Sequence, residues 1–344
     1  MAKKIISWVV LSVLILIFIV SSSSSWMKKI TEQRWKSNNK IWRSDGFRYG
    51  DLFYMSFLSN YKIDKSWNPK RVKKDSSFID LYIIGDSYLK YITDKNIFAG
   101  VDNLMFVDWR YEPMEISLRK NKKNILIFET TERHFRERFH DTSNFKFQFV
   151  AKNKRPASLY SFNEIIRIVN QFLFNKNINQ NLEFNLFDYP IFTKIKSIKA
   201  DFNESVFSRH SPEVSMADDK SILFLSTTTD TTVTTSSFNS VSEKEMDQIR
   251  MIADVVFQHY KNFGFEKILF SVIPNPVSIT GYKNYTYNNL IPLFENQKVN
   301  FTLVDLYNDY SKKPVLNNYF AGDSHWNTNG LQLWLDKINA ELLK

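Results

Sequence analysis

The feature that most constrains the fold is a series of short apolar runs, each followed by polar turn residues. The runs are too short for typical buried helices and show no alternation of apolar and polar residues. Strands of this composition are buried on both faces, as in a parallel sheet covered by helices. The runs occupy residues 78–84, 104–107, 124–128, 221–225, 267–273 and 300–306.

Amphipathic helix patterns lie between these runs. Ser242 and Glu245 form an S-x-x-E capping box, apolar residues then recur on one helical face as far as Tyr260, and Gly264 closes the segment. A second apolar stripe over residues 331–342 predicts a closing helix. Alternating strands and helices predict an α/β fold, a three-layer α/β/α sandwich with a mainly parallel sheet.

The N-terminus predicts a membrane anchor. Lys3 and Lys4 precede the apolar run Ile5–Val20, and the Ser21–Ser25 tract follows it without an A-x-A cleavage site. We therefore favour an uncleaved anchor within residues 1–26 over a cleaved signal peptide. Lysines before the run place the N-terminus in the cytoplasm and the remaining chain outside it, in the periplasm.

The rest of the chain divides unevenly. Residues 27–78 are polar with scattered aromatics and predict a stalk and an irregular N-terminal wrap. Residues 79–344 predict the catalytic domain, interrupted at about 140–220 by an insertion with helical stretches at Phe162–Phe174 and Tyr189–Phe207. The tract Thr227–Ser237 is nearly all Thr and Ser; we favour a flexible loop over an edge strand or a hydroxyl-rich sugar contact.

Composition excludes several kinds of site. The chain has no cysteine, so it forms no disulfide and no thiolate metal site, and its 5 histidines show no metal-ligand spacing. We expect no metal and no cofactor. The net charge is +10, with basic runs at 70–74 and 119–123. A solvated face is favoured for these runs over a contact with acidic lipids or polymers, and no nucleic-acid-binding module is recognised.

Two motifs at opposite ends of the soluble part carry the chemistry. Ser87 follows the first apolar run in a Gly-Asp-Ser turn, and His325 follows the last run in Asp-Ser-His-Trp. Asp323 is placed to hold one ring nitrogen of His325, leaving the other to deprotonate Ser87. Sites in parallel sheets form at the carboxyl ends of the strands, so both motifs are expected in one crevice. This set suits acyl transfer, with the Ser87 backbone N–H at a helix N-terminus as one oxyanion donor.

These motifs resemble those of the SGNH-hydrolase superfamily. GDSY at 85–88 together with Asp-x-His-Trp at 323–326 is most similar to the alginate O-acetyltransferase type. Residues 127–133 resemble that group's strand ending in Glu-x-x-Glu-Arg, and residues 272–274 its strand ending in Val-x-Pro. The likeness covers most of residues 80–344. The serine motif comes first here, so the chain looks circularly permuted relative to that group, and it has Asp-x-His where the superfamily usually has Asp-x-x-His.

The resemblance implies that Ser87 is the nucleophile, His325 the base and Asp323 its orienting acid. It implies an extracytoplasmic O-acyltransferase, and specifically an O-acetyltransferase. It further implies an envelope or secreted polysaccharide as acceptor and a membrane-bound O-acyltransferase partner that delivers the acyl group. The superfamily's oxyanion Gly and Asn have no clear counterpart. Candidates for oxyanion or substrate binding are Arg110, Arg133, Asn275 and Trp326.

Two other function classes remain open at this stage. A carbohydrate esterase would use the same triad with water as the acceptor. A non-catalytic polysaccharide-binding scaffold would keep the fold without the reaction. The complete set of Ser87, His325 and Asp323 argues against the scaffold, since a degenerate site tolerates the loss of one member.

Overall fold

The computed structural model describes most of the chain and divides it into two compact units. The described residues are 2–39, 41–45, 48–72, 78–90, 92–110, 112–141, 147–152, 169–170, 172–296 and 299–344. Unit 1 comprises the described parts of Met1–Asp64 and Lys154–His210, and unit 2 those of Lys65–Asn153 and Ser211–Lys344. The segment predicted as an insertion therefore groups, over residues 154–210, with the N-terminal part of the chain.

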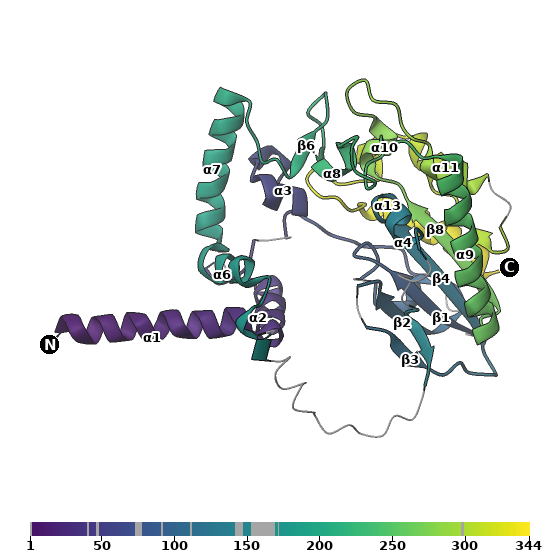
Figure 1. The fold of residues 1–344 in the computed structure, drawn as a ribbon, viewed down its shortest axis with the longest axis horizontal. Helices are drawn as coiled ribbons and strands as arrows, with labels where there is room; N and C mark the ends of the chain where they lie inside the picture. The colour runs from purple at the N-terminus through teal and green to yellow at the C-terminus, as the bar shows by residue number, and fades with distance from the viewer. Residues whose placement is uncertain are drawn as a thin grey trace. The chain divides into compact units, whose positions relative to one another are not determined.

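Unit 2 is a mixed α/β unit built on a parallel sheet (Figure 1). Its strands are β1 (Ile79–Gly85), β2 (Val101–Asp108), β3 (Met114–Ile116), β4 (Lys123–Thr131), β5 (Phe149–Ala151), β6 (Val214–Met216), β7 (Leu223–Leu225), β8 (Lys267–Ile273) and β9 (Thr302–Leu303). Its helices are η2 (Lys95–Ile97), α4 (Glu132–Arg138), α8 (Ser226–Thr229), α9 (Glu243–Phe263), α10 (Pro276–Thr280), α11 (Leu290–Glu295), α12 (Tyr307–Ser311), η4 (Val315–Asn317) and α13 (Thr328–Leu342).

The central sheet has the strand order β2-β1-β4-β8-β9, and all its pairs are parallel. Gly85 pairs with Asp108 of β2, and Ile84 pairs with Phe128 of β4. The chain thus passes from β1 to β2 on one side and then to β4 on the other. The strand order reverses between β1 and β4, and such a reversal leaves a crevice at the carboxyl ends of the strands.

The sheet is buried on both faces, as the apolar runs predict. Along β1, Leu81 and Ile83 join one core cluster, whereas Tyr82 and Ile84 join a second one. Helix α13 contributes Trp334, Leu335 and Ile338 to the first cluster, and α9 contributes its apolar face to the second. Alternate residues of each strand therefore pack under different helices, which explains why the strand sequences are apolar throughout.

The helices predicted at 242–264 and 331–342 are confirmed, as α9 and α13. The side chain of Ser242 accepts a hydrogen bond from the backbone of Glu245 at the start of α9, and Gly264 ends that helix with a φ of 117°. The positive φ is a conformation that glycine adopts without steric cost. The predicted Tyr189–Phe207 helix appears as α7 (Pro190–Phe207) in unit 1, whereas most of Phe162–Phe174 lies outside the described residues.

Three expectations are wrong. The run at 221–225 contributes β7, which pairs antiparallel with β6 outside the central sheet. The run is apolar because Ile222 and Phe224 enter the first core cluster. The Thr/Ser tract, for which we favoured a flexible loop, is not a loop throughout, because it contains α8 and its residues Thr228, Thr229, Ser236 and Ser237 are buried. The stretch 27–78 is not wholly irregular, because it contains further helices.

Unit 1 is helical over its described residues. Its elements are α1 (Ala2–Ser22), α2 (Ser24–Lys36), α3 (Asp51–Ser56), η1 (Ser59–Tyr61), α6 (Ile178–Phe187) and α7 (Pro190–Phe207). The guanidinium of Arg34 in α2 is buried and donates hydrogen bonds to the carbonyls of Trp42, Phe184 and Asp188. This one side chain therefore joins α2 to the segment between α6 and α7. Two of the acceptors, Phe184 and Asp188, belong to the last turn of α6 and its C-cap, where helix carbonyls need partners from outside the helix.

Helix α1 is long and apolar enough to cross a membrane over Lys3–Ser22, and it is the one helix among the described residues that meets this test. Only 11% of that window is buried within the protein. A core helix of a soluble protein would be mostly covered by its neighbours. The exposed apolar surface of α1 is thus typical of a segment that meets lipid.

Candidate functional site

The site begins at the turn that ends β1. A Cβ atom on Gly85 would lie 2.9 Å from Oε2 of Glu129 and 3.2 Å from the ring of Phe106, so a side chain here would collide with both. The close approach lets Glu129 Oε2 accept a hydrogen bond from the Asp86 backbone at 2.8 Å. Glycine therefore allows a buried acid to hold the turn that carries Ser87.

The backbone after Ser87 is a turn rather than the predicted helix N-terminus. The N–H groups of Leu89 and Lys90 both donate to the carbonyl of Asp86 at 3.2 Å. The side chain of Asp86 accepts from the backbone of Tyr88 at 3.0 Å. Among the described residues, the Ser87 N–H donates to no acceptor, and it remains the candidate oxyanion donor without support from a helix dipole.

The structure brings the two distant motifs together. Oγ of Ser87 lies 2.9 Å from Nε2 of His325, and Nδ1 of His325 lies 2.6 Å from Oδ1 of Asp323. An ionised carboxylate only accepts hydrogen bonds, so Nδ1 carries the proton. The lone pair of Nε2 then faces Ser87, which is the arrangement in which an imidazole can take a hydroxyl proton.

Asp323 is fully buried and both of its oxygens are engaged. Oδ1 also accepts from the His325 backbone at 2.9 Å, and Oδ2 forms an ion pair with Nζ of Lys65 at 2.6 Å. Burial alone would raise the pKa of Asp323, but its interactions with His325 and Lys65, which both donate hydrogen bonds to it, outweigh burial and hold that pKa well below its usual range. Asp323 is therefore ionised at neutral pH.

The His325 loop is held by aromatic packing. The Tyr88 ring lies 4.7 Å from the His325 ring and 5.2 Å from the Trp326 ring, measured between centroids. The Tyr88 hydroxyl donates to the carbonyl of Ser324. Tyr88, which follows Ser87, therefore packs directly against His325, and this limits the rotation of both motifs.

A second close approach fixes the loop against the closing helix. A Cβ atom on Gly330 would lie 2.4 Å from the carbonyl oxygen of Asn318 and 2.8 Å from Cβ of Trp326. The side chain of Asn327 accepts from the backbone N–H groups of Asn329 and Gly330 and so caps α13. The first turn of α13 can thus lie directly against the segment that carries His325.

Two buried acids lie beneath the Ser87 turn. Burial, and then the charge of Asp86, raise the pKa of Glu129 well above its usual value. Burial also opposes ionisation of Asp86, but Arg138 and Arg133 outweigh it and lower its pKa. One acid is therefore neutral and the other charged, and Arg138 Nη1 lies 3.5 Å from Oδ2 of Asp86.

A further buried acid, Glu132 at the start of α4, is hydrogen-bonded to α10 and its N-cap residue. Oε2 of Glu132 accepts from the Asn275 backbone at 2.8 Å and from the Ser278 hydroxyl at 2.6 Å. Burial raises the pKa of Glu132 to about 7, against the effect of those hydrogen bonds. The amide of Asn275 donates to the Ser237 hydroxyl at 3.0 Å, so the Thr/Ser tract is tied into this network.

The four remaining candidates differ in their surroundings. Arg110 forms a two-point ion pair with Asp108, at 2.5 and 2.8 Å. Trp326 is 1% exposed and packs against the rings of Tyr88 and Trp334, which favours a structural role. Asn275 is also 1% exposed, and its Oδ1 accepts no hydrogen bond within the described part of the chain. The Arg133 guanidinium lies 5.7 Å from the Tyr88 ring centroid, so it is the candidate charge beside the Ser87–His325 pair.

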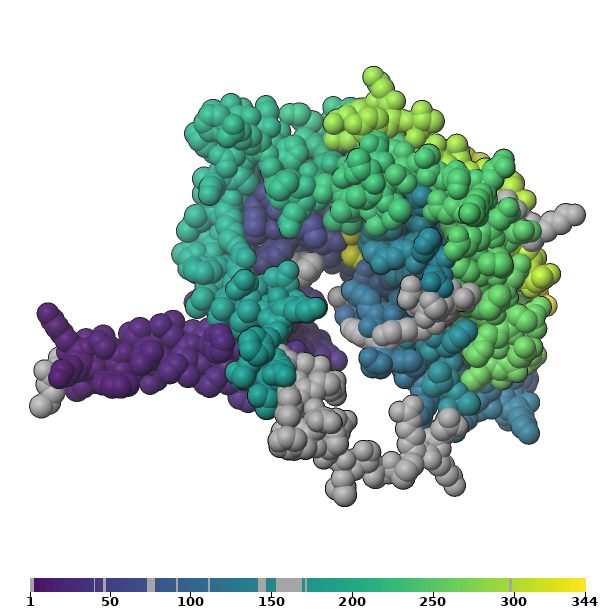
Figure 2. Space-filling model, viewed as in Figure 1, coloured from purple at the N-terminus to yellow at the C-terminus, as the bar shows by residue number. Residues whose placement is uncertain are grey.

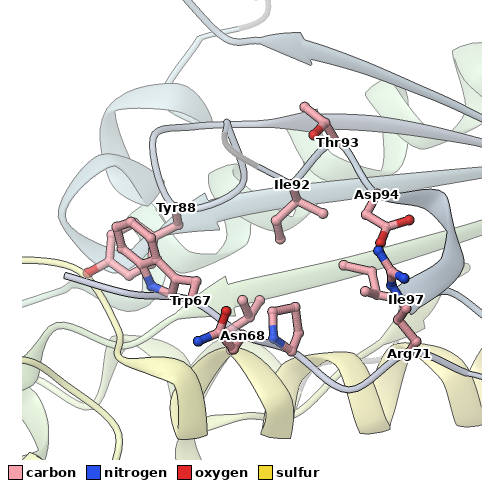
Figure 3. A pocket seen from close by; sticks show the side chains of 10 residues that line it. Trp67, Asn68, Arg71, Tyr88, Ile92, Thr93, Asp94 and Ile97 are labelled. Carbon is pink, nitrogen blue, oxygen red and sulfur yellow. The ribbon is translucent and has the colours of Figure 1, made fainter. Parts of the chain in front are cut away.

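Sequence reasoning missed Lys65 and Tyr88. Lys65 lies 258 residues from Asp323, and no motif marks it. Tyr88 stands within the GDSY motif but shows no sign of packing on a histidine. Tyr88 also lines a cavity of about 380 Å³ that sequence patterns do not reveal (Figure 3). Its lining residues are Trp67, Asn68, Pro69, Arg71, Tyr88, Ile92, Thr93, Asp94, Ile97 and Leu331.

The cavity lies next to the turn that carries Ser87, because Tyr88 lines it. Figure 3 shows Trp67 and Tyr88 at one end of it and the Arg71–Asp94 pair at the other, where Nε and Oδ2 are 3.0 Å apart. Aromatic faces with a few polar groups suit binding of a polar ring compound. Comparison of the chain with family models, with curated proteins and with solved structures found no match.

Proposed function

We propose that this protein is an O-acyltransferase, and specifically an acetyltransferase, acting on an envelope or secreted polysaccharide. The observation that carries the proposal is the chain of contacts from Ser87 Oγ through His325 to the ionised Asp323. Side chains from residues 238 positions apart meet at hydrogen-bond distance. The buried position and low pKa of Asp323 support a permanent negative charge behind the imidazole.

The reaction follows from this geometry. His325 Nε2 takes the hydroxyl proton as Ser87 Oγ attacks the acyl carbonyl, and the charge of Asp323 stabilises the imidazolium. The bond to the donor's leaving group then breaks, and that group takes the proton from His325. A sugar hydroxyl next loses its proton to His325 and attacks the acyl-serine. The ester bond to Ser87 breaks and Oγ recovers the proton.

The finer fold assignment belongs to the same proposal. The β2-β1-β4-β8-β9 order, with core clusters formed by alternate strand residues, supports a three-layer α/β/α sandwich of the SGNH-hydrolase kind. Ser87 at the end of β1 lies where the strand order reverses, which is the position expected for a site in such a sheet.

The setting we propose is extracytoplasmic. The exposed apolar surface of α1 supports a single-pass anchor, and Lys3 and Lys4 before its apolar run support a cytoplasmic N-terminus. A tethered domain meets a membrane-embedded acyl donor at high effective concentration, which favours transfer over free hydrolysis. A membrane-bound O-acyltransferase is the donor partner we propose, and the cavity beside Tyr88 is the proposed place for one acceptor sugar unit.

Turnover of a chromogenic acetyl ester by the full chain in detergent tests the proposal. Ser87→Ala and His325→Ala should each abolish turnover, and the double variant should lose no more, because the two residues act as one unit. Ser117→Ala, at an exposed serine of unit 2, is the matched control and should retain activity. Wild-type turnover by Ser87→Ala would exclude Ser87 as the nucleophile, and absence of turnover by the wild-type chain would favour the scaffold.

Addition of an oligosaccharide separates transfer from hydrolysis. A transferase should attach acetyl to the sugar, seen as a mass gain of one acetyl group, while less acetate is released. An unmodified sugar with unchanged acetate release would favour the esterase, which uses the same three residues with water.

A further inference from the structure

Helix α7 of unit 1 carries an uncovered apolar stripe. Five of its residues recur at helical spacing, and each is more than half exposed: Ile191, Ile195, Ile198, Phe202 and Val206. At about 100° per residue these positions fall within roughly 80° of one another around the helix. A soluble protein rarely leaves such a continuous apolar face open to water.

The opposite face of α7 packs on its own unit. Thr193 is buried, and Nζ of Lys196 lies 4.9 Å from the centroid of the Phe57 ring. Oδ1 of Asp201 accepts from the backbone of Ser59 at 2.9 Å. These contacts fix the rotation of α7 about its axis, so the apolar stripe must point away from α3 and η1.

The start of α7 is tied to the end of α1. In α6, Asn181 donates to the Ser21 carbonyl at 2.7 Å and Asn185 to the Ser21 hydroxyl at 2.8 Å. Helix α6 therefore covers the last turn of the apolar helix, where a membrane-spanning segment meets the headgroup region. Only Asp188 and Tyr189 separate α6 from α7, and buried Arg34 holds the Asp188 carbonyl.

Within unit 1, α7 runs crosswise to α1 (Figure 1). In Figure 1, α1 extends to the left of unit 1, whereas α3 lies to the right of α7. The space-filling view shows α7 at the outer surface of the unit (Figure 2). A bilayer crossed by α1 would therefore have a surface alongside α7. The stripe, which points away from α3, would face that surface.

The residues beside the stripe fit a lipid headgroup region. Lys194 and Lys199 are exposed and occupy helical positions on either side of the stripe. Lysines so placed can lay their alkyl stems along an apolar surface and keep their ammonium groups among phosphates. Trp26, 48% exposed in the first turn of α2, gives the end of α1 an interfacial aromatic.

We infer that α7 is an interfacial helix whose apolar stripe inserts into the surface of the bilayer that α1 spans. The ligand is a phospholipid bilayer rather than a protein. The inference rests on α1 crossing the membrane, and it is independent of the acyl-transfer reaction. It gives unit 1 a second attachment, which restricts rotation of the unit about α1.

Nitroxide labels test this placement in the full chain, which has no native cysteine to interfere. Single Cys variants at Ile195, Ile198 and Phe202 report on the stripe, and Asn203→Cys reports on a different side of α7. Leu14→Cys lies within α1. Met251→Cys on α9 is the matched control, because Met251 is 59% exposed and Ile198 is 63% exposed.

The labelled chains are reconstituted into vesicles of phosphatidylcholine and phosphatidylglycerol. Collision with oxygen, which concentrates in lipid, is compared with collision with a water-soluble nickel chelate. Stripe labels should collide severalfold less with nickel and more with oxygen than the label at Met251, and Asn203 should fall between them.

Three results would overturn the inference. Nickel access along the stripe equal to that at Met251, with Leu14 in lipid, would leave α7 in water. Dipolar broadening between copies labelled at Ile198 would assign the stripe to a second copy of the chain. A water-exposed Leu14 would remove the premise that α1 spans the bilayer, and this outcome is distinguishable from the first.

Discussion

Nζ of Lys65 lies 2.6 Å from Oδ2 of Asp323, on the side of the carboxylate that does not face His325. Both oxygens of Asp323 are therefore held, Oδ1 by the imidazole of His325 and Oδ2 by the ammonium of Lys65. An uncompensated buried carboxylate is costly, so Lys65 allows Asp323 to remain ionised in a dry position. Lys65 acts through Asp323 and is a positioning residue.

Lys65→Met should lower kcat for an acetyl ester by roughly 10- to 100-fold, because a charged hydrogen bond contributes about 1.5–3 kcal/mol. Loss of the ammonium also raises the pKa of Asp323, so the loss of activity on acidification should begin at a higher pH. Lys65→Arg should restore much of both properties. Lys70→Met, at an exposed lysine of the same segment, should match wild type; equal pH profiles for Lys65→Met and wild type would exclude the role.

Glu132 predicts how stability depends on pH. Its folded pKa of about 7 lies above the usual value of 4.5, so the folded state retains a proton that the unfolded chain loses. This proton stabilises the folded state fully below about pH 4.5. As the pH rises to about 7, the free energy of unfolding therefore falls by roughly 3 kcal/mol. Denaturant unfolding gives the free energy of unfolding at pH 5 and at pH 7. The decrease between these two values should be smaller for Glu132→Gln than for wild type.

Exposed Glu137 on the same helix supplies the control, and Glu137→Gln should keep the wild-type decrease. Burial also raises the pKa of Glu295, to about 8. Glu295 therefore contributes part of the decrease in the free energy of unfolding, and this part remains in every variant. An unchanged pH dependence in Glu132→Gln would show that Glu132 ionises normally in the folded state.

Gly330→Ala should destabilise unit 2 by about 1–3 kcal/mol, the usual cost of overpacking. The added methyl would lie 2.4 Å from a backbone oxygen, which cannot move aside as a flexible side chain can. Thermal unfolding measures this loss, and ester turnover should fall with it because α13 supports the His325 loop. A Tm equal to that of wild type would contradict the packing described at this position.

The cavity beside Tyr88 predicts a split between acceptor and donor kinetics. Thr93→Phe places a ring at the cavity rim and should raise KM for an oligosaccharide acceptor while turnover of a small acetyl ester stays near wild type. Thr231→Phe, at an exposed threonine outside the cavity, should change neither. Equal acceptor KM for both variants would place the sugar elsewhere.

Local patterns in the sequence predicted the strands of the central sheet, the two long amphipathic helices of unit 2 and the meeting of Ser87 with His325. These predictions succeeded because the burial of β1 and the cap at Ser242 are encoded in a few adjacent residues. The end of β1 also determines where a site can form in a parallel sheet. The proximity of Ser87 and His325 could therefore be predicted from the expected ends of the strands.

Features that depend on long-range packing were missed. Lys65 gives no local sign of pairing with Asp323, and Ser237 gives none of bonding to Asn275. Polar composition suggested a loop for the Thr/Ser tract, but hydroxyls are buried readily when they find partners. Strand β7 was misassigned because an apolar run indicates burial without specifying which neighbour provides it.

The central claim is that the acyl group passes through Ser87. Rapid quenching of the full chain during turnover of an acetyl ester, followed by digestion and mass spectrometry, tests it most directly. We predict one added acetyl group on the peptide that contains Ser87, formed before product reaches its steady rate and absent in Ser87→Ala. Turnover by the wild-type chain with that peptide unmodified, or acetyl on another residue that persists in Ser87→Ala, would contradict it.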